Sequence, residues 1–243
     1  MDLFDLLWIA ACVAVAGFSQ SISGFGFALI AVPLMSLVVD PRVAVVVSTF
    51  VGAVASTSQA FAGRRQVVRP IATRMALASC IGMPLGLAAF VVFSERALRL
   101  TVGVAVLFAL ATLVAGFRLP PERHRFDWLL GIFSGALATS TSTNGPPLVF
   151  VLQARGLAPD EFRATINTVF TVANAGAIVL FLAAGKVNSA GLAGAAIAIP
   201  VLAVSMRLGF AVRDHLSVDG FRTVVLVLLG VSGVSALGAA LAM

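Results

Sequence analysis

Apolar residues run along the chain in eight long stretches that contain no charged side chain. These stretches cover residues 6–39, 43–63, 75–94, 100–117, 128–154, 164–185, 187–206 and 223–243. A helix needs about 20 apolar residues to cross the hydrocarbon core of a bilayer, and about 18 is the usual threshold for recognising one. The pattern therefore predicts an all-α polytopic membrane protein with about eight hydrophobic segments in a single transmembrane domain, residues 1–243.

Two of the eight stretches have a length that fits neither one crossing nor two. As a single helix, residues 6–39 would measure roughly 50 Å, whereas the hydrocarbon core measures roughly 30 Å. Helix-breaking residues interrupt both stretches near the middle, at residues 20–26 (QSISGFG) and 140–147 (STSTNGPP). Non-helical backbone at membrane depth is tolerated only where it is buried in protein or lines a water-filled cavity. We therefore expect each stretch to form a broken, re-entrant helical hairpin with its tip near the midplane.

The positions of Lys and Arg favour the same topology. If all eight stretches crossed the membrane, the two faces would carry eight basic residues each. If the two broken stretches return to the face they start from, the distribution becomes twelve against four. Cytoplasmic loops carry the excess of basic residues in membrane proteins. The sequence thus predicts a multi-pass protein of the cytoplasmic membrane, with the Arg-rich loops in the cytoplasm and both termini outside.

The predicted topology divides the chain into two similar halves. Each half holds one hairpin and three transmembrane helices, an odd number, so the halves enter the membrane from opposite sides as inverted repeats. Repeat one covers about 4–117, a linker covers 118–125, and repeat two covers about 126–243. Short matches support duplication: FDLLW at 4–8 resembles FDWLL at 126–130, and DPR at 40–42 resembles DEFR at 160–163.

Composition excludes several classes of function. Hydrophobic residues make up 60% of the chain and charged residues 11%, and the net charge of +6 comes from loop arginines, so a nucleic-acid partner is not expected. The two cysteines and two histidines have no metal-ligand spacing, and we expect no metal and no cofactor. All ten carboxylates lie at the edges of apolar stretches or in loops, whereas an embedded enzyme or proton relay needs ionisable groups inside the bundle. No catalytic residue is therefore predicted.

The two hairpin tips carry the candidate site. A helix N-terminus presents unpaired N–H groups and roughly half a positive charge, so two of them meeting at the midplane would hold a small anion without a buried cation. Ser23 and Asn144 suit the N-cap position, and Pro146 or Pro147 suits the first helical turn. The glycines would let the backbone approach a ligand, although small residues also serve helix packing. The expected substrate-binding residues are Gln20, Ser21, Ser23, Gly24, Gly26, Thr141, Thr143, Asn144, Gly145, Pro146 and Asn167, with Ser142 as a further hydrogen-bonding group.

A few residues outside the breaks are candidates for a transport pathway. Asn167, Thr171 and Asn174 recur at helical spacing and form a polar stripe, which either faces a pathway or forms a hydrogen-bonded seam between helices. Ser48 is the corresponding candidate in the first half, with Ser56 and Gln59 on the same helix. Phe25 and Phe27 flank the first tip and either gate the site or pack the hairpin.

The residues at the tips resemble those of a known family. GFGFALIAVP at 24–33, NGPPLVFVLQAR at 144–155 and FRAT at 162–165 are similar to the sulfite exporter TauE/SafE family of membrane permeases. The resemblance extends over essentially the whole chain. It implies secondary transport of small sulfur-containing anions, such as sulfite or organosulfonates, across the cytoplasmic membrane, commonly by export.

The sequence therefore favours a secondary transporter or facilitator for a small anion bound between two hairpin tips. A non-transporting membrane scaffold or assembly factor is an alternative, since the Gly-rich breaks would then serve packing alone. A membrane-embedded enzyme is less favoured because no base is found. The expected partners are the lipid bilayer and a small anionic substrate, and a homo-oligomer is compatible with the sequence.

Overall fold

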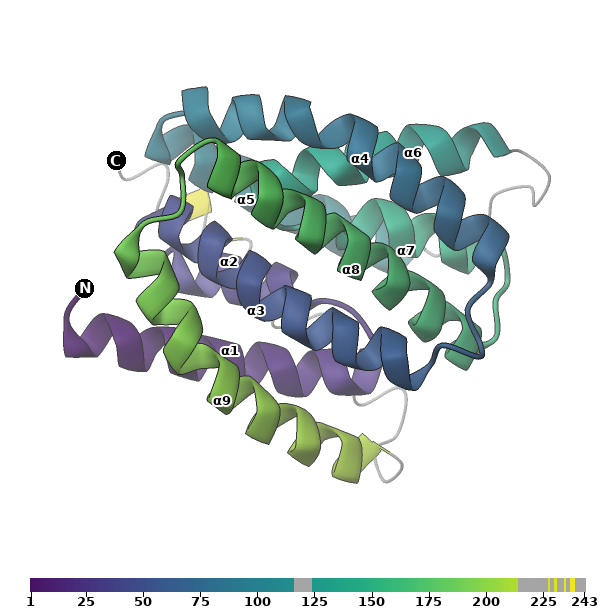
Figure 1. Cartoon of the computed structure of the whole chain (residues 1–243), viewed down its shortest axis with the longest axis horizontal. Coiled ribbons are helices and arrows are strands. Elements are labelled where there is room, and N and C mark those ends of the chain that lie inside the picture. The colour runs from purple at the N-terminus through teal and green to yellow at the C-terminus, as the bar shows by residue number, and fades with distance from the viewer. Residues whose placement is uncertain (116–123, 214–226, 228–229, 231–233, 235–236, 239–243) are drawn as a thin grey trace.

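The computed structural model describes residues 1–115 and 124–213, together with the isolated positions 227, 230, 234, 237 and 238 (Figure 1). Every regular element in these residues is an α-helix. The helices are α1 (Leu3–Ser23), α2 (Phe27–Met35), α3 (Pro41–Ala62), α4 (Arg69–Val92), α5 (Glu95–Ala115), α6 (His124–Ser140), α7 (Gly145–Ala154), α8 (Pro159–Ala183) and α9 (Ser189–Arg213).

Five of the described helices are long and apolar enough to cross a membrane: α1, α3, α4, α8 and α9. The prediction of an all-helical, multi-pass membrane protein is thus confirmed. The last apolar stretch and most of the predicted linker lie outside the described residues, so the count of eight segments stays a prediction. Two residues assigned to the linker, His124 and Arg125, belong to α6.

Both broken stretches fold as pairs of helices that are joined by a short tip. The first break lies between α1 and α2, where Gly24 has a φ of 84° and Gly26 a φ of 94°. These left-handed values favour glycine, which has no Cβ to clash with the backbone. The second break lies between α6 and α7 and includes Ser142, which has a φ of 59°.

Contacts between the far ends of each pair show that its second limb turns back toward the start of the first. In the first pair, Trp8 Nε1 at the start of α1 donates to the carbonyl of Leu34 at the end of α2, at 2.9 Å. In the second, Arg155, which follows α7, bonds Asp127 in the first turn of α6 at 2.6 Å. Each pair is therefore a helical hairpin.

Asp127 corrects one expectation from the sequence. Its side chain is completely buried, and it forms ion pairs with Arg74 of α4 at 3.1 Å and with Arg155 at 2.6 Å. The expectation that every carboxylate lies outside the helix packing is wrong for this residue. A charge-free stretch shows where the apolar part of a helix lies. It does not show that α4 covers the first turn of α6, where Asp127 stands.

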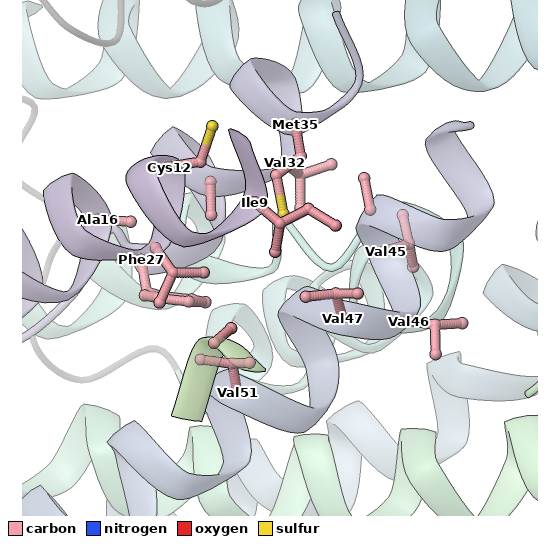
Figure 2. Close-up of a cluster of buried hydrophobic side chains, with 14 of the residues drawn as sticks. Ile9, Cys12, Ala16, Phe27, Val32, Met35, Val45, Val46, Val47 and Val51 are labelled. Atoms are coloured by element: carbon pink, nitrogen blue, oxygen red, sulfur yellow. The ribbon is translucent and has the colours of Figure 1, made fainter. Parts of the chain in front are cut away.

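The main apolar core fixes the first hairpin against α3. Figure 2 shows side chains of α1, α2 and α3 pointing into one cluster. Its labelled members are Ile9, Cys12, Ala16, Phe27, Val32, Met35, Val45, Val46, Val47 and Val51, all of them buried. Because Phe27 opens α2 and anchors in this core, the first tip has a defined position relative to α3.

Glycines bring two other pairs of helices into close contact. Gly82 and Gly86 of α4 face backbone carbonyls of α6, and Gly135 of α6 faces the carbonyl of Ser79 in α4. On the other side of the molecule, Gly17 of α1 faces Ser205 of α9, and Gly209 of α9 faces Ser21 of α1. Small residues at such crossings let two helix backbones approach closely. The first limb of each hairpin is thus packed against a helix from the other half of the chain.

Candidate functional site

The two hairpin tips line one central cavity. Its volume is about 30 Å³, larger than the roughly 10–15 Å³ that one water molecule requires. The walls come from the end of α1, the start of α2, one face of α3, the tip between α6 and α7, and α8. The lining residues are Gln20, Gly26, Phe27, Ala28, Leu29, Ser48, Gly52, Ser56, Ser142, Thr143, Asn144, Gly145, Phe170 and Asn174.

Three lining residues present polar atoms that have no hydrogen-bond partner among the described residues. These atoms are Gln20 Oε1, Ser48 Oγ and Asn144 Nδ2, and the three residues are only 2%, 1% and 6% exposed. Leaving a buried polar group unpaired costs about 1–3 kcal/mol. The cavity therefore offers these atoms to a bound polar molecule.

The first tip offers backbone donors. Ile30 donates the first helical hydrogen bond of α2, to the Gly26 carbonyl at 3.2 Å. The N–H groups of Phe27, Ala28 and Leu29 lie ahead of it, at the positive end of the helix dipole. The predicted N-cap role of Ser23 is wrong: Ser23 is the last residue of α1, and Gly26 caps α2.

The second tip has few backbone N–H donors, and the side chain of Asn144 adds to them. Asn144 is the N-cap of α7, as predicted, but its side chain makes no capping hydrogen bond. Pro146 and Pro147 in the first turn have no N–H, so Gly145 alone supplies one there. The Asn144 amide adds two further N–H groups at this end of the cavity.

A buried chain of hydrogen bonds links the first tip to α8. Asn167 Nδ2 donates to the carbonyls of Gly24 and Arg163, both at 2.8 Å. Asn167 Oδ1 accepts from Gln20 Nε2 at 3.3 Å. Asn167 is completely buried and does not line the cavity. It holds Gln20 and the tip in position.

The structure brings about half of the sequence candidates to the cavity. Of the expected substrate-binding residues, Gln20, Gly26, Thr143, Asn144 and Gly145 line it, as does Ser142. Of the pathway candidates, Phe27, Ser48 and Asn174 line it. Asn174 Nδ2 also lies 3.4 Å from Ser56 Oγ on α3, so this part of the polar stripe joins two helices across the site.

The other candidates lie outside the lining and make local contacts. Ser21 donates to the Phe18 carbonyl at 2.7 Å and faces α9 at Gly209. Thr141 bonds Thr143 at 2.7 Å, and Thr171 bonds the Asn167 carbonyl within its own helix. Phe25 packs edge to face with Phe162. Ser23, Gly24 and Pro146 shape the tips without lining the cavity.

Sequence reasoning missed four lining residues: Ala28, Leu29, Gly52 and Phe170. Gly52 lies midway between Ser48 and Ser56 at a spacing of four, so a stripe of small residues on α3 was a detectable signal. Phe170 shares a helical face with Asn167 and Asn174, but nothing distinguishes an aromatic residue there from a core residue. Ala28 and Leu29 reach the cavity through their place in the first turn of α2.

The cavity is polar without being charged. None of the described residues that line it is Asp, Glu, Lys, Arg or His. A second, larger cavity of about 260 Å³ lies at the end of α3 and includes Gln59, Gln66, Asp160 and Arg163. The Arg163 side chain also packs beside Gly24. A basic residue therefore stands next to the first tip but outside the central site.

Comparison with known proteins decides the family. The family model of the sulfite exporter TauE/SafE matches residues 9–236, nearly the whole chain. The chain belongs to the sulfite exporter TauE/SafE family. A relative from Cupriavidus necator, described as a probable sulfite/organosulfonate exporter TauE, is 27% identical over 219 residues, which are 85% of this chain and 84% of the relative. No solved structure matches the chain.

Membership of the TauE/SafE family fixes the broad class of function. Its members are membrane transporters and not enzymes, so this chain is a membrane transporter. The alternative of a membrane-embedded enzyme is thereby set aside. This TauE/SafE transporter has a polar cavity between its two helix breaks.

Proposed function

We propose that this transporter is a secondary exporter or facilitator for sulfite or a related organosulfonate in the cytoplasmic membrane. The anion would bind in the central cavity, between the two hairpin tips. The observation that carries the proposal is the convergence of both tips on one cavity with unpaired buried donors. The description of the Cupriavidus necator relative as a probable sulfite/organosulfonate exporter supports the choice of sulfur-containing anions.

The donor set of the cavity suits an anion better than a cation. Backbone N–H groups of α2, the Gly145 N–H, the Asn144 amide and the Ser48 hydroxyl all face or border it. Oriented N–H groups at a helix start stabilise negative charge without a basic side chain. A site without a fixed positive charge also releases its ligand more readily, which transport requires.

Two inverted repeats would supply the movement. If α1, α2, α3 and α4 correspond to α6, α7, α8 and α9, the most extensive helix contacts in the structure map onto one another. The α1–α9 contact corresponds to α6–α4, the α3–α9 contact to α8–α4, and the α1–α2 contact to α6–α7. This matching supports a pseudo-twofold arrangement, in which rocking of one repeat against the other would expose the site alternately to each side.

Labelling of single cysteines would test the proposed topology. In a background with Cys12 and Cys80 replaced by alanine, we expect Leu3→Cys and Leu37→Cys to react with an impermeant thiol reagent from outside. Arg65→Cys, in the loop after α3, should react only after the membrane is opened. Reaction of Leu3→Cys and Leu37→Cys from opposite sides would overturn the re-entrant arrangement of the first hairpin.

Removing the Asn144 amide should reduce transport strongly. We expect Asn144→Ala to lower the rate of sulfite efflux from proteoliposomes by about tenfold or more, since a hydrogen bond to a charged group is worth roughly 1.5–3 kcal/mol. Asn188→Ala is the matched control: Asn188 accepts from the Gly191 N–H at the start of α9, outside the cavity. Folded Asn144→Ala protein with the wild-type rate would mean that the tips serve packing alone. Wild-type protein that moves no sulfur anion under any gradient would overturn the proposed function.

A further inference from the structure

The orientation of the Gln20 amide is fixed by its neighbours. Oxygen and nitrogen of a side-chain amide are assigned from the hydrogen bonds they make. The Asn167 nitrogen must face the Gly24 and Arg163 carbonyls, because only a donor can satisfy two acceptors at 2.8 Å. Asn167 therefore turns its side-chain oxygen toward Gln20. Since this oxygen can only accept, Gln20 donates to it through Nε2. The Gln20 Oε1 atom therefore has no hydrogen-bond partner among the described residues.

The Gln20 oxygen gives the cavity an acceptor among its donors. Gln20 lines the cavity, is 2% exposed, and its Oε1 has no hydrogen-bond partner in the part of the chain that the structure describes. A ligand whose polar atoms are all acceptor oxygens could accept hydrogen bonds from Asn144 and Ser48. Its oxygens would, however, be repelled by Gln20 Oε1, because both carry negative partial charge. A ligand that also carries an O–H or N–H would satisfy all three.

Resting on the function proposed above, we infer that the site selects anions that carry one negative charge and one hydrogen-bond donor. In the case of sulfite, the site would prefer the hydrogensulfite monoanion to the sulfite dianion, because the O–H tautomer of hydrogensulfite can donate a hydrogen bond. For organosulfonates it means those with a hydroxyl or amino group near the sulfonate. Hydrogensulfite then crosses the protein together with its proton, and no proton-carrying side chain is needed in the cavity.

The pH dependence of binding would come from the ligand, because the described lining contains no group that titrates near neutral pH. Arg163 lies beside the first tip, and it bonds Asn167 of the Gln20 network through its backbone carbonyl. Charged and titratable residues on α1 and on the helices packed against α1, α2 and α8 also lie outside the lining. Together with the residues that cap these helices, they are Asp2, Asp5, Cys12, Asp40, Arg42, Arg69, Arg74, Cys80, Glu95, Arg96, Arg99, His124, Arg125, Asp127, Arg155, Asp160, Glu161, Arg163, Arg207 and Arg213.

Two sulfonates of nearly equal size test the inference directly. Isethionate ends in a hydroxyl where propanesulfonate ends in a methyl group, and both keep one negative charge across the pH range. We expect the purified protein to bind isethionate about tenfold or more tightly than propanesulfonate, since the methyl group of propanesulfonate would leave the buried Gln20 acceptor unpaired. Sulfite affinity should fall as the pH rises through its second ionisation, whereas isethionate affinity should stay constant.

The variant Gln20→Met removes the acceptor at similar side-chain length. It should bring the two sulfonates to about equal affinity, chiefly by weakening isethionate. Equal affinities in the wild-type chain, or sulfite binding that strengthens with pH, would overturn the inference and leave the proposed function standing. If Gln20→Met does not fold, the wild-type comparison still decides. A wild-type chain that binds none of the three anions would overturn the proposed function itself, and the inference with it.

Discussion

Gly135→Ala is expected to prevent native packing of the transporter. A Cβ at this position would lie 1.9 Å from the carbonyl oxygen of Ser79 in α4 and 2.6 Å from its carbonyl carbon. Real Cβ atoms do not approach backbone atoms so closely, and a helix backbone cannot yield in the way that a flexible side chain does. The two helices would have to separate, which would also break the bond from Thr139 Oγ1 to the Met83 carbonyl, 2.6 Å long.

Two further glycines make the same kind of close backbone contact where α4 crosses α6, and they add to the expected loss of stability. Gly82 and Gly86 of α4 would place a Cβ 1.8 Å and 2.0 Å from the carbonyl oxygens of Ile132 and Ala136. Separation at one glycine therefore loosens the whole α4–α6 contact. Because α6 is the first limb of the second hairpin, the central cavity would lose its shape as well. We expect little monodisperse protein on size exclusion, and no cooperative thermal transition at the wild-type temperature.

Gly52→Ala provides the matched control at membrane depth. A Cβ on Gly52 would meet its nearest neighbour, Asn174 Nδ2, at 3.5 Å, an ordinary contact distance. Alanine also favours a helix over glycine by about 1 kcal/mol. This variant should fold at least as stably as the wild type in the same thermal assay. Should Gly135→Ala match it, close backbone contact between α4 and α6 would not be what holds the second hairpin.

The breaks were predictable because they are local features of the sequence. The closely spaced Gly24 and Gly26 favour a break between helices, and the Gly-Pro-Pro run at 145–147 favours a new helix start. The lengths of the two stretches and the distribution of basic residues then favoured hairpins. The residues at the two breaks that reach the cavity, such as Gln20 and Asn144, followed from this local reasoning.

The roles of other residues depend on partners that are distant in sequence. Asn167 belongs to the same polar stripe as Asn174, yet it bonds the Gly24 carbonyl 143 residues away and does not line the cavity. Ser21 lies in the last turn of α1, just before the first break, but its side chain faces Gly209 of α9. No spacing rule identifies such partners, because helices far apart in the chain meet only in the folded bundle. The burial of Asp127 was missed for the same reason.

Asp127→Leu is expected to lower stability by about 3 kcal/mol, because removing one partner of a buried ion pair is strongly destabilising. Arg155 and Arg74 would then face each other, with side chains that are only 11% and 27% exposed. The loss should appear as a lower unfolding temperature and as easier proteolysis after α7. Asp5→Asn, at the matching position of the first half, should change stability by less than about 1 kcal/mol, because Asp5 only accepts the exposed Asp2 N–H at 3.0 Å.

A second substitution separates lost charge from lost packing at this position. Adding Arg155→Leu to Asp127→Leu replaces both members of this ion pair by apolar side chains, and apolar replacement of a buried ion pair is often neutral or better. The double variant should therefore recover part of the stability that Asp127→Leu loses. If it is instead less stable by the sum of both single effects, the Asp127–Arg155 pair does not couple the two ends of the second hairpin. Recovery without restored transport would indicate that the charges serve a change between inward-facing and outward-facing states as well as the fold.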